Sequence, residues 1–134
     1  MELDILKLTS AAVSARDMSY SPYSNFKVGA ALFSKSGKIY KGCNIENAAY
    51  TPSICAERTA FAKAVSEGEY EFLAIAVAGW ANKPGFAFPC GVCRQVMMEF
   101  CDPLKFTIIV TNGSENREYT LTELLPEGFG PNSL

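Results

Sequence analysis

The sequence contains no histidine. This absence excludes Ser-His-Asp and Cys-His nucleophile systems and any metal site of the HExxH type. The chain also has little net charge, because 12 Lys and Arg residues stand against 14 Asp and Glu residues and leave −2. Such a balance argues against non-specific binding of nucleic acid and against a basic patch for a membrane surface. Any catalysis therefore depends on carboxylates, thiols or a metal held by thiolates.

Long apolar runs are missing as well. The longest, Phe72–Trp80, falls far short of the roughly 18 residues that a transmembrane helix needs. Residues 1–7 lack the basic start and the apolar core of a signal peptide. The five cysteines are odd in number, which fits a disulfide framework poorly. We therefore expect a cytoplasmic protein whose cysteines take part in metal or redox chemistry.

The length of 134 residues is close to the commonest domain size, so we expect a single domain over residues 1–134. Charged residues make up only 19% of the chain, somewhat below the usual quarter. This low fraction suggests that some surface is buried in an oligomer.

Hydrophobic periodicity predicts alternating helices and strands. The predicted helices cover residues 3–18, 55–66 and 90–100, with one further turn at 120–125, and the predicted strands cover 28–34, 38–43, 72–79 and 106–111. The first two strands form a hairpin through residues 35–38, whereas helices connect the later strands as crossovers. This order predicts an α/β fold with a mixed sheet and helices packed on its faces.

Cysteines occur where loops lead into two of these helices. Cys55-Ala56-Glu57 begins one helix, and Pro89-Cys90-Gly91-Val92-Cys93 begins the other. Thiols at a helix N-terminus have a lowered pKa, so Cys55, Cys90 and Cys93 can bind zinc as thiolates. Three protein ligands leave the fourth zinc position open, as catalytic sites require. Glu57 lies two residues from a ligand and can transfer protons there.

The charge of such a site requires compensation. One Zn²⁺ with three thiolates has a net charge of −1, which opposes the ionisation of bound water. Arg58 follows Cys55 by three residues on the same helix face and can reach back to the sulfurs. Arg94, next to Cys93, is a second candidate cation.

Several motifs together resemble those of the short, homotetrameric cytidine deaminases that hold zinc with three cysteines. The cysteine and glutamate motif at the two helix starts also occurs in deaminases that edit polynucleotides. Phe26 and residues 44–47 resemble only the deaminases that act on free nucleosides. The matching segments are residues 19–26, 28–31, 42–48, 55–60, 89–95 and 123–126.

The resemblance implies a three-layer α-β-α fold with a five-stranded mixed sheet and helices on both faces. It implies one zinc per subunit and hydrolytic deamination of cytidine and 2′-deoxycytidine in pyrimidine salvage, a hydrolase reaction at a C–N bond of a cyclic amidine. Zinc-bound hydroxide would attack C4 of the base, and Glu57 would carry protons to N3 and to the departing ammonia. Arg58 would donate to the zinc thiolates.

The resemblance also implies how a nucleoside binds. Phe26 would lie against the pyrimidine ring, Asn44 and Glu46 would hold the ribose 3′-hydroxyl, and the backbone N–H of Ala56 would meet O2 of the base. A further group of residues would complete sites across the subunit boundaries of a homotetramer: Ala48, Tyr50 and Phe129.

Some alternatives stay open at this stage. Cys43 and Cys101 are interpreted as buried core residues, although either thiol could close the zinc site as a fourth ligand. Phe88 stands before Pro89 where the family more often has Ser. Rival functions are a deaminase for a cytosine-nucleoside antibiotic, a polynucleotide editing enzyme and a non-catalytic domain stabilised by zinc.

Overall fold

A mixed sheet of five strands forms the centre of the computed structural model, which describes residues 2–134. Their order across the sheet is β2-β1-β3-β4-β5. The strands are β1 (Lys27–Ser34), β2 (Ile39–Cys43), β3 (Phe72–Trp80), β4 (Thr107–Thr111) and β5 (Asn116–Thr120). Only β3 and β4 pair in parallel, and every other neighbouring pair is antiparallel.

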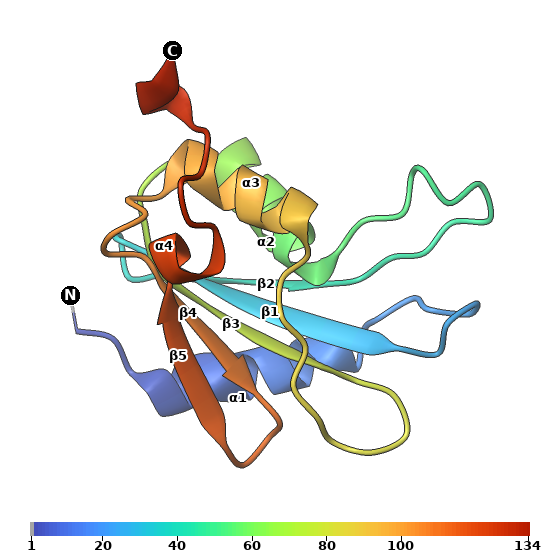
Figure 1. Cartoon of the computed structure of the whole chain (residues 1–134). Coiled ribbons are helices and arrows are strands. Elements are labelled where there is room, and N and C mark those ends of the chain that lie inside the picture. Colours follow the sequence, from blue (N-terminus) through green and yellow to red (C-terminus); the bar gives the residue numbers. More distant parts are fainter. Residues whose placement is uncertain (1) are drawn as a thin grey trace.

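Helices cover both faces of this sheet (Figure 1). The helices are α1 (Ile5–Arg16), α2 (Ala56–Ser66), α3 (Gly91–Phe100) and α4 (Leu121–Leu124), followed by a short 3₁₀ turn, η1 (Pro131–Ser133). Helix α1 packs on one face, while α2 and α3 lie side by side on the other. Within residues 2–134, no helix has both the length and the apolar character needed to cross a membrane.

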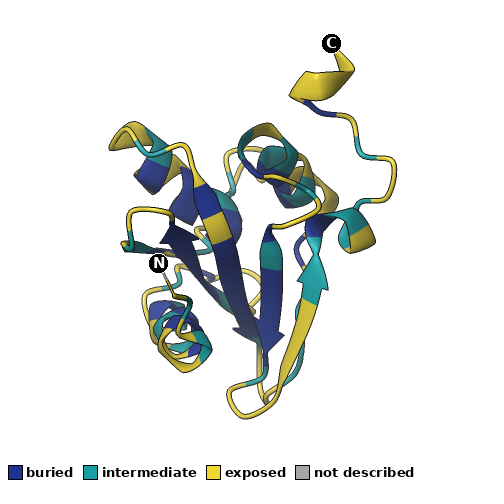
Figure 2. Ribbon diagram, turned by 90° about the vertical axis from the view of Figure 1, so that its left-hand side faces the viewer, coloured by how far each residue is buried: buried dark blue, intermediate teal, exposed yellow. Residues whose placement is uncertain are grey.

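The core consists of one layer on each side of the sheet, with the central strands buried between the two (Figure 2). Alternate residues of one strand face opposite layers, so Ala31 packs toward α1 while Ala30 and Leu32 pack toward α2 and α3. Strand β3 is buried along nearly its whole length, as expected for an apolar strand covered on both faces.

A glycine sets how closely α2 approaches the sheet. A Cβ atom at Gly42 of β2 would lie 2.5 Å from both the carbonyl oxygen of Ala56 and the backbone nitrogen of Ala60. The absence of a side chain at Gly42 therefore lets the first turns of α2 lie directly on β2. This contact fixes the position of the helix start that carries Cys55 and Glu57.

The expected α/β fold, with a mixed sheet and helices on both faces, is confirmed. The predicted turn at 120–125 is α4, which Thr120 and Glu123 begin with a reciprocal capping box. The residue pattern predicted four strands and missed β5, whereas the family resemblance implied five. Strand β5 is exposed or half-buried along its length and therefore lacks a buried apolar stripe.

Candidate active site

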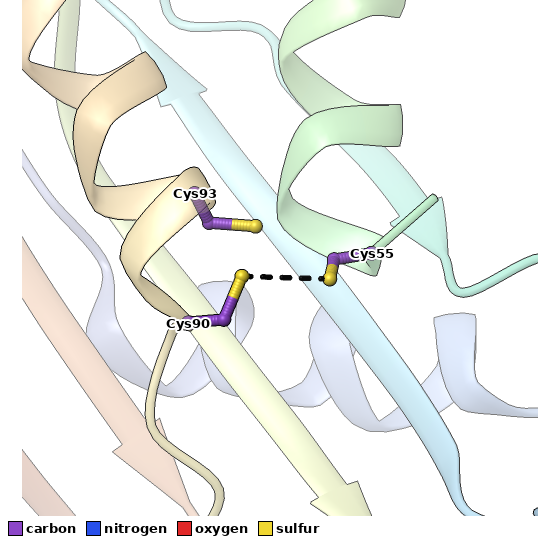
Figure 3. A group of neighbouring side chains, drawn as sticks. All are labelled: Cys55, Cys90 and Cys93. Atoms are coloured by element: carbon purple, nitrogen blue, oxygen red, sulfur yellow. Dashed lines mark hydrogen bonds between the residues drawn. The ribbon is translucent and has the colours of Figure 1, made fainter. Parts of the chain in front are cut away.

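The starts of α2 and α3 bring three cysteines together (Figure 3). Cys55 is the N-cap of α2 and Cys90 the N-cap of α3, both with extended backbone, and Cys93 follows in the first turn of α3. Their sulfurs all lie within 4.8 Å of one another, and those of Cys55 and Cys90 are 3.8 Å apart. Free backbone N–H groups at both helix starts favour negative charge on these sulfurs.

These three sulfurs fit a zinc ion. Zinc–sulfur bonds of about 2.3 Å at tetrahedral angles place neighbouring sulfurs roughly 3.8 Å apart. The distance between the Cys55 and Cys90 sulfurs matches that value. Among residues 2–134, these are the only three Cys, Asp or Glu residues whose ligand atoms cluster in this way.

The thiols of the cluster differ in acidity. The pKa of Cys55 falls to about 5, because the Cys93 thiol and the Arg58 guanidinium both donate hydrogen bonds to its sulfur. The pKa of Cys93 rises, because its thiol donates to Cys55 and is largely buried. Cys55 is therefore a thiolate at neutral pH, the form in which cysteine binds metal.

Arg58 contacts the cluster, as the charge argument predicted. Its Nη2 lies 3.5 Å from the Cys55 sulfur, and this contact raises the pKa of the guanidinium. Arg94 was the second candidate, and this prediction was wrong. Arg94 donates from Nε to the Pro89 carbonyl at 2.7 Å and from Nη1 to the Leu124 carbonyl at 2.5 Å. Both donors are thus engaged by backbone oxygens away from the sulfurs.

Glu57 is buried beside the cysteines. Only 4% of its surface is exposed, in the first turn of α2. Burial raises the pKa of its carboxyl group to about 7. A carboxyl group with this pKa exists in both protonation states near neutral pH, which suits a group that takes up and releases a proton.

The sequence of the chain matches a known protein family. Residues 4–109 match the family model described as the cytidine and deoxycytidylate deaminase zinc-binding region. The chain belongs to this deaminase family. The matched residues include all three cysteines and Glu57.

Individual relatives agree over nearly the whole chain. A cytidine deaminase of Sporosarcina psychrophila is 46% identical over 132 residues, which are 98% of this chain and 96% of the relative. A cytidine deaminase of Halalkalibacterium halodurans is also 46% identical, over 95% of each chain. The crystal structure of a cytidine deaminase from Burkholderia pseudomallei superimposes with a TM-score of 0.86 at 45% identity, and the match covers 95% of this chain and 100% of that one.

Two of the predicted substrate contacts in this deaminase lie on the loop after β2. The Asn44 side chain accepts from the Val28 N–H at 2.9 Å and donates to the Phe26 carbonyl at 2.8 Å. The Glu46 carboxylate accepts from the Tyr23 N–H at 2.9 Å. These bonds connect the loop after β2 with the turn that carries Phe26.

The other predicted contacts are spread around the two helix starts. Ala56 is fully buried as the first residue of α2, where backbone N–H groups lack acceptors within the helix. Phe26, Tyr50 and Phe129 expose 40%, 77% and 58% of their surface. Ala48 is also exposed, on the loop that carries Tyr50. None of these five residues contacts the sulfurs through a hydrogen bond in the described part of the chain.

One contact next to the site was not predicted from the sequence. Gln95 follows Cys93 by two residues and donates from Nε2 to the Phe129 carbonyl at 2.8 Å. The next residue, Gly130, is buried against Met98 of α3. The backbone at Phe129 is thus held on α3 while its ring stays exposed. No local sequence signal indicates a bond between residues this far apart.

The remaining two cysteines stay outside the zinc cluster. Cys101 is buried, with 8% of its surface exposed, and burial raises the pKa of its thiol. Its interpretation as a core residue is confirmed. Cys43 is only half-buried, and its thiol donates to the Met18 carbonyl at 3.3 Å, so the core interpretation was wrong for this residue. Neither thiol provides a fourth zinc ligand.

Proposed function

We propose that this protein catalyses the hydrolytic deamination of cytidine and 2′-deoxycytidine to uridine and 2′-deoxyuridine, with release of ammonia. The observation that carries this proposal is the cluster of Cys55, Cys90 and Cys93 next to the buried Glu57, in a chain of the deaminase family. Relatives that match nearly its whole length are named cytidine deaminases. The net charge of −2 argues against a polynucleotide substrate.

The three cysteines would hold one zinc ion per subunit. Zinc with three protein ligands keeps a position for water and lowers the pKa of that water toward neutrality. Arg58 compensates the excess negative charge of the thiolates through its contact with the Cys55 sulfur. Together with the hydrogen bond from the Cys93 thiol, which is the larger cause, Arg58 lowers the pKa of Cys55 to about 5 and so favours the thiolate that binds metal.

Glu57 is the proton carrier of the reaction. Its carboxylate takes one proton from the attacking water and gives it to N3 of the pyrimidine. It then takes the second proton from the hydroxyl group newly bound to C4 and gives it to the amino group. The C4–N bond breaks, ammonia leaves, and the oxygen at C4 becomes the carbonyl of the product. Burial supports this role, because it keeps the pKa of Glu57 near neutrality and keeps bulk water away from the carboxyl group.

The nucleoside is bound by residues around the two helix starts. Phe26 lies against the base, the Ala56 N–H donates to O2 of the base, and Asn44 and Glu46 hold the ribose 3′-hydroxyl. An amide and a carboxylate suit a sugar hydroxyl, which both donates and accepts. Asn44 supports this role, because one Nδ2 hydrogen remains after its bond to Phe26.

The active protein is a homotetramer in which neighbouring subunits share sites. Tyr50 and Phe129 are large side chains that expose 77% and 58% of their surface in the single chain, and Cys90 is exposed as well. Ala48, Tyr50 and Phe129 would cover a neighbour's site when subunits assemble. Sedimentation should therefore give a tetramer, whereas an active monomer would contradict this arrangement.

Residues 1–134 form a single domain, and its compartment is the cytoplasm. The zinc site supports this location, because it needs three cysteines that are not oxidised, and the cytosol keeps cysteines reduced. Oxidation would join two sulfurs of the cluster and remove the metal site.

Turnover of zinc-loaded protein tests the proposed reaction. Addition of cytidine or deoxycytidine should cause the loss of ultraviolet absorbance that accompanies deamination, with one ammonia released per base. Glu57→Gln should bind zinc as the parent does, but its deamination rate should fall by at least about 10²-fold. Glu99→Gln changes an exposed residue of α3 and is the control, with the zinc content and rate of the parent. Zinc-loaded protein that turns over neither nucleoside would leave a cytosine-antibiotic deaminase or a non-catalytic zinc domain as the explanation.

A further inference from the structure

A serine hydroxyl connects Glu46 to the backbone of Phe26. Ser24 donates from Oγ to Oε2 of the Glu46 carboxylate, and the same Oγ accepts from the Phe26 N–H at 3.0 Å. The other carboxylate oxygen, Oε1, accepts from the backbone N–H of Ser24 at 3.2 Å and of Tyr23 at 2.9 Å. One carboxylate therefore accepts three hydrogen bonds from the turn before Phe26.

Asn44 fixes the other side of the same residue. Its Nδ2 donates to the Phe26 carbonyl at 2.8 Å, while Oδ1 accepts from Val28 N–H at 2.9 Å. Both backbone polar groups of Phe26 are thus bonded to side chains, even though the ring is 40% exposed. Asn25, between Ser24 and Phe26, has a φ of 57°, a left-handed conformation that asparagine adopts more often than most residues.

We propose that Ser24 is a positioning residue, which transmits the fixed position of Glu46 to Phe26 and so orients the aromatic wall of the nucleoside site. This inference rests on the proposed function and adds a second role to Glu46, which acts on the base through Ser24 as well as on the ribose. The hydrogen bonds carry the argument, because they form an unbroken path from the carboxylate through Ser24 Oγ to the Phe26 N–H.

The electrostatics of the turn agree with this role. The bond from the Ser24 hydroxyl is the largest cause that holds the pKa of Glu46 below its ordinary value, and the Tyr23 and Ser24 N–H groups contribute further. The carboxylate is therefore charged at neutral pH. Bonds to a charged acceptor are stronger than bonds between neutral groups.

The test compares Ser24→Ala with the parent as full-length, zinc-loaded protein, on cytidine and on 3′-deoxycytidine. In Ser24→Ala the Glu46 carboxylate keeps its bonds from the Tyr23 and Ser24 backbone N–H groups, so its contact with the ribose should persist, whereas the Phe26 N–H loses its acceptor. Ser24→Ala should therefore lower kcat/KM about three- to tenfold on both substrates by the same factor, mainly through KM. Ser24→Thr keeps a hydroxyl and should restore most of the loss. Ser114→Ala removes a similar exposed hydroxyl in the β4–β5 turn and should have no effect.

A double-mutant cycle separates positioning from a general loss of structure. In a Phe26→Ala background, Ser24→Ala should cause no further loss, because the ring that it orients is gone. Hydrogen exchange gives a second measurement that does not depend on activity: the Phe26 amide should exchange faster in Ser24→Ala.

Three results would overturn the inference: unchanged kinetics in Ser24→Ala, a loss confined to cytidine, or an equal loss in the Phe26→Ala background. A loss confined to cytidine would mean that Ser24 acts on the 3′-hydroxyl. A failure of the proposed function appears separately, since the parent itself would then not turn over cytidine, and the inference would fall with it.

Discussion

Gly42→Ala tests how the position of α2 on the sheet maintains the zinc site. The added Cβ would lie 2.5 Å from two backbone atoms of α2, the Ala56 oxygen and the Ala60 nitrogen. Neither atom can avoid the added Cβ by a change of rotamer, because both belong to the helix backbone. The helix start must therefore move about 1 Å away from β2 to reach an ordinary van der Waals separation of roughly 3.5 Å.

The cost follows from the size of this displacement. Overpacking a well-packed core by one methyl group costs about 1–3 kcal/mol. For a domain of this length, a loss of about 2 kcal/mol lowers Tm by roughly 6–10 °C. Cys55 directly precedes Ala56, so its sulfur moves with the helix. The expected displacement is larger than the deviation of about 0.2 Å within which metal–ligand distances normally stay. Zinc binding should weaken by about 10- to 100-fold, as for other disturbances around a bound metal.

Thermal unfolding and competition with a zinc chelator measure the two effects. Gly85→Ala is the matched control, because a Cβ at Gly85 meets nothing within 4 Å and its φ is not positive. This control should stay within about 0.5 kcal/mol of the parent and bind zinc equally well. A Gly42→Ala protein with the parent's Tm and zinc affinity would refute the claim that this contact fixes the site.

Three further predictions concern thiols, pH and the C-terminal segment. Zinc should protect the three clustered cysteines from labelling by a maleimide. Cys43 should be labelled with or without metal, and the buried Cys101 should stay unlabelled. Mass spectrometry of the peptides measures the labelling, and protection of a different cysteine by zinc would contradict the ligand set. Glu46 has a lowered pKa in the folded protein, so its stabilisation is complete above the unfolded pKa of about 4.3 and is lost as pH falls through the folded value. The difference in Tm between the parent and Glu46→Gln should therefore be constant above about pH 5 and shrink on acidification; a constant difference down to pH 3 would contradict this. Gln95→Met removes the bond to the Phe129 carbonyl and should raise KM about three- to tenfold with zinc content unchanged, whereas an unchanged KM would remove Phe129 from the site.

The order of elements could be predicted from the sequence because each one has a strong local signal. Strand β3 is a continuous apolar run, and α2 and α3 begin at recognisable loop ends. Strand β5 has no buried apolar stripe, but the turn before it has a local signal, because it contains Asn112 and Gly113 and Gly113 has a φ of 99°. Asn-Gly is a strong sign of a hairpin.

The zinc ligands could be predicted for a similar reason. A Cys-x-x-Cys at a helix start brings two sulfurs together through local geometry. The position of Cys55 beside them depends on the packing of α2 against α3, and the family resemblance supplied that part of the prediction. Arg58 was also predictable, because three residues along a helix return to the same face. The hydrogen-bond partner of the Arg94 side chain could not be predicted, because its acceptor, the Leu124 carbonyl, lies 30 residues away in the chain. Hydrogen bonds that join distant segments, such as Ser24 to Glu46, require the folded structure.

The most direct test of the central claim is a zinc titration of metal-free protein, with cytidine deamination measured at each point. The three cysteines form a single cluster in the described chain, so the rate should rise in proportion to added zinc and stop rising at one zinc per chain. Full activity without zinc, or a chain that binds one zinc and releases no ammonia from cytidine, would contradict the account.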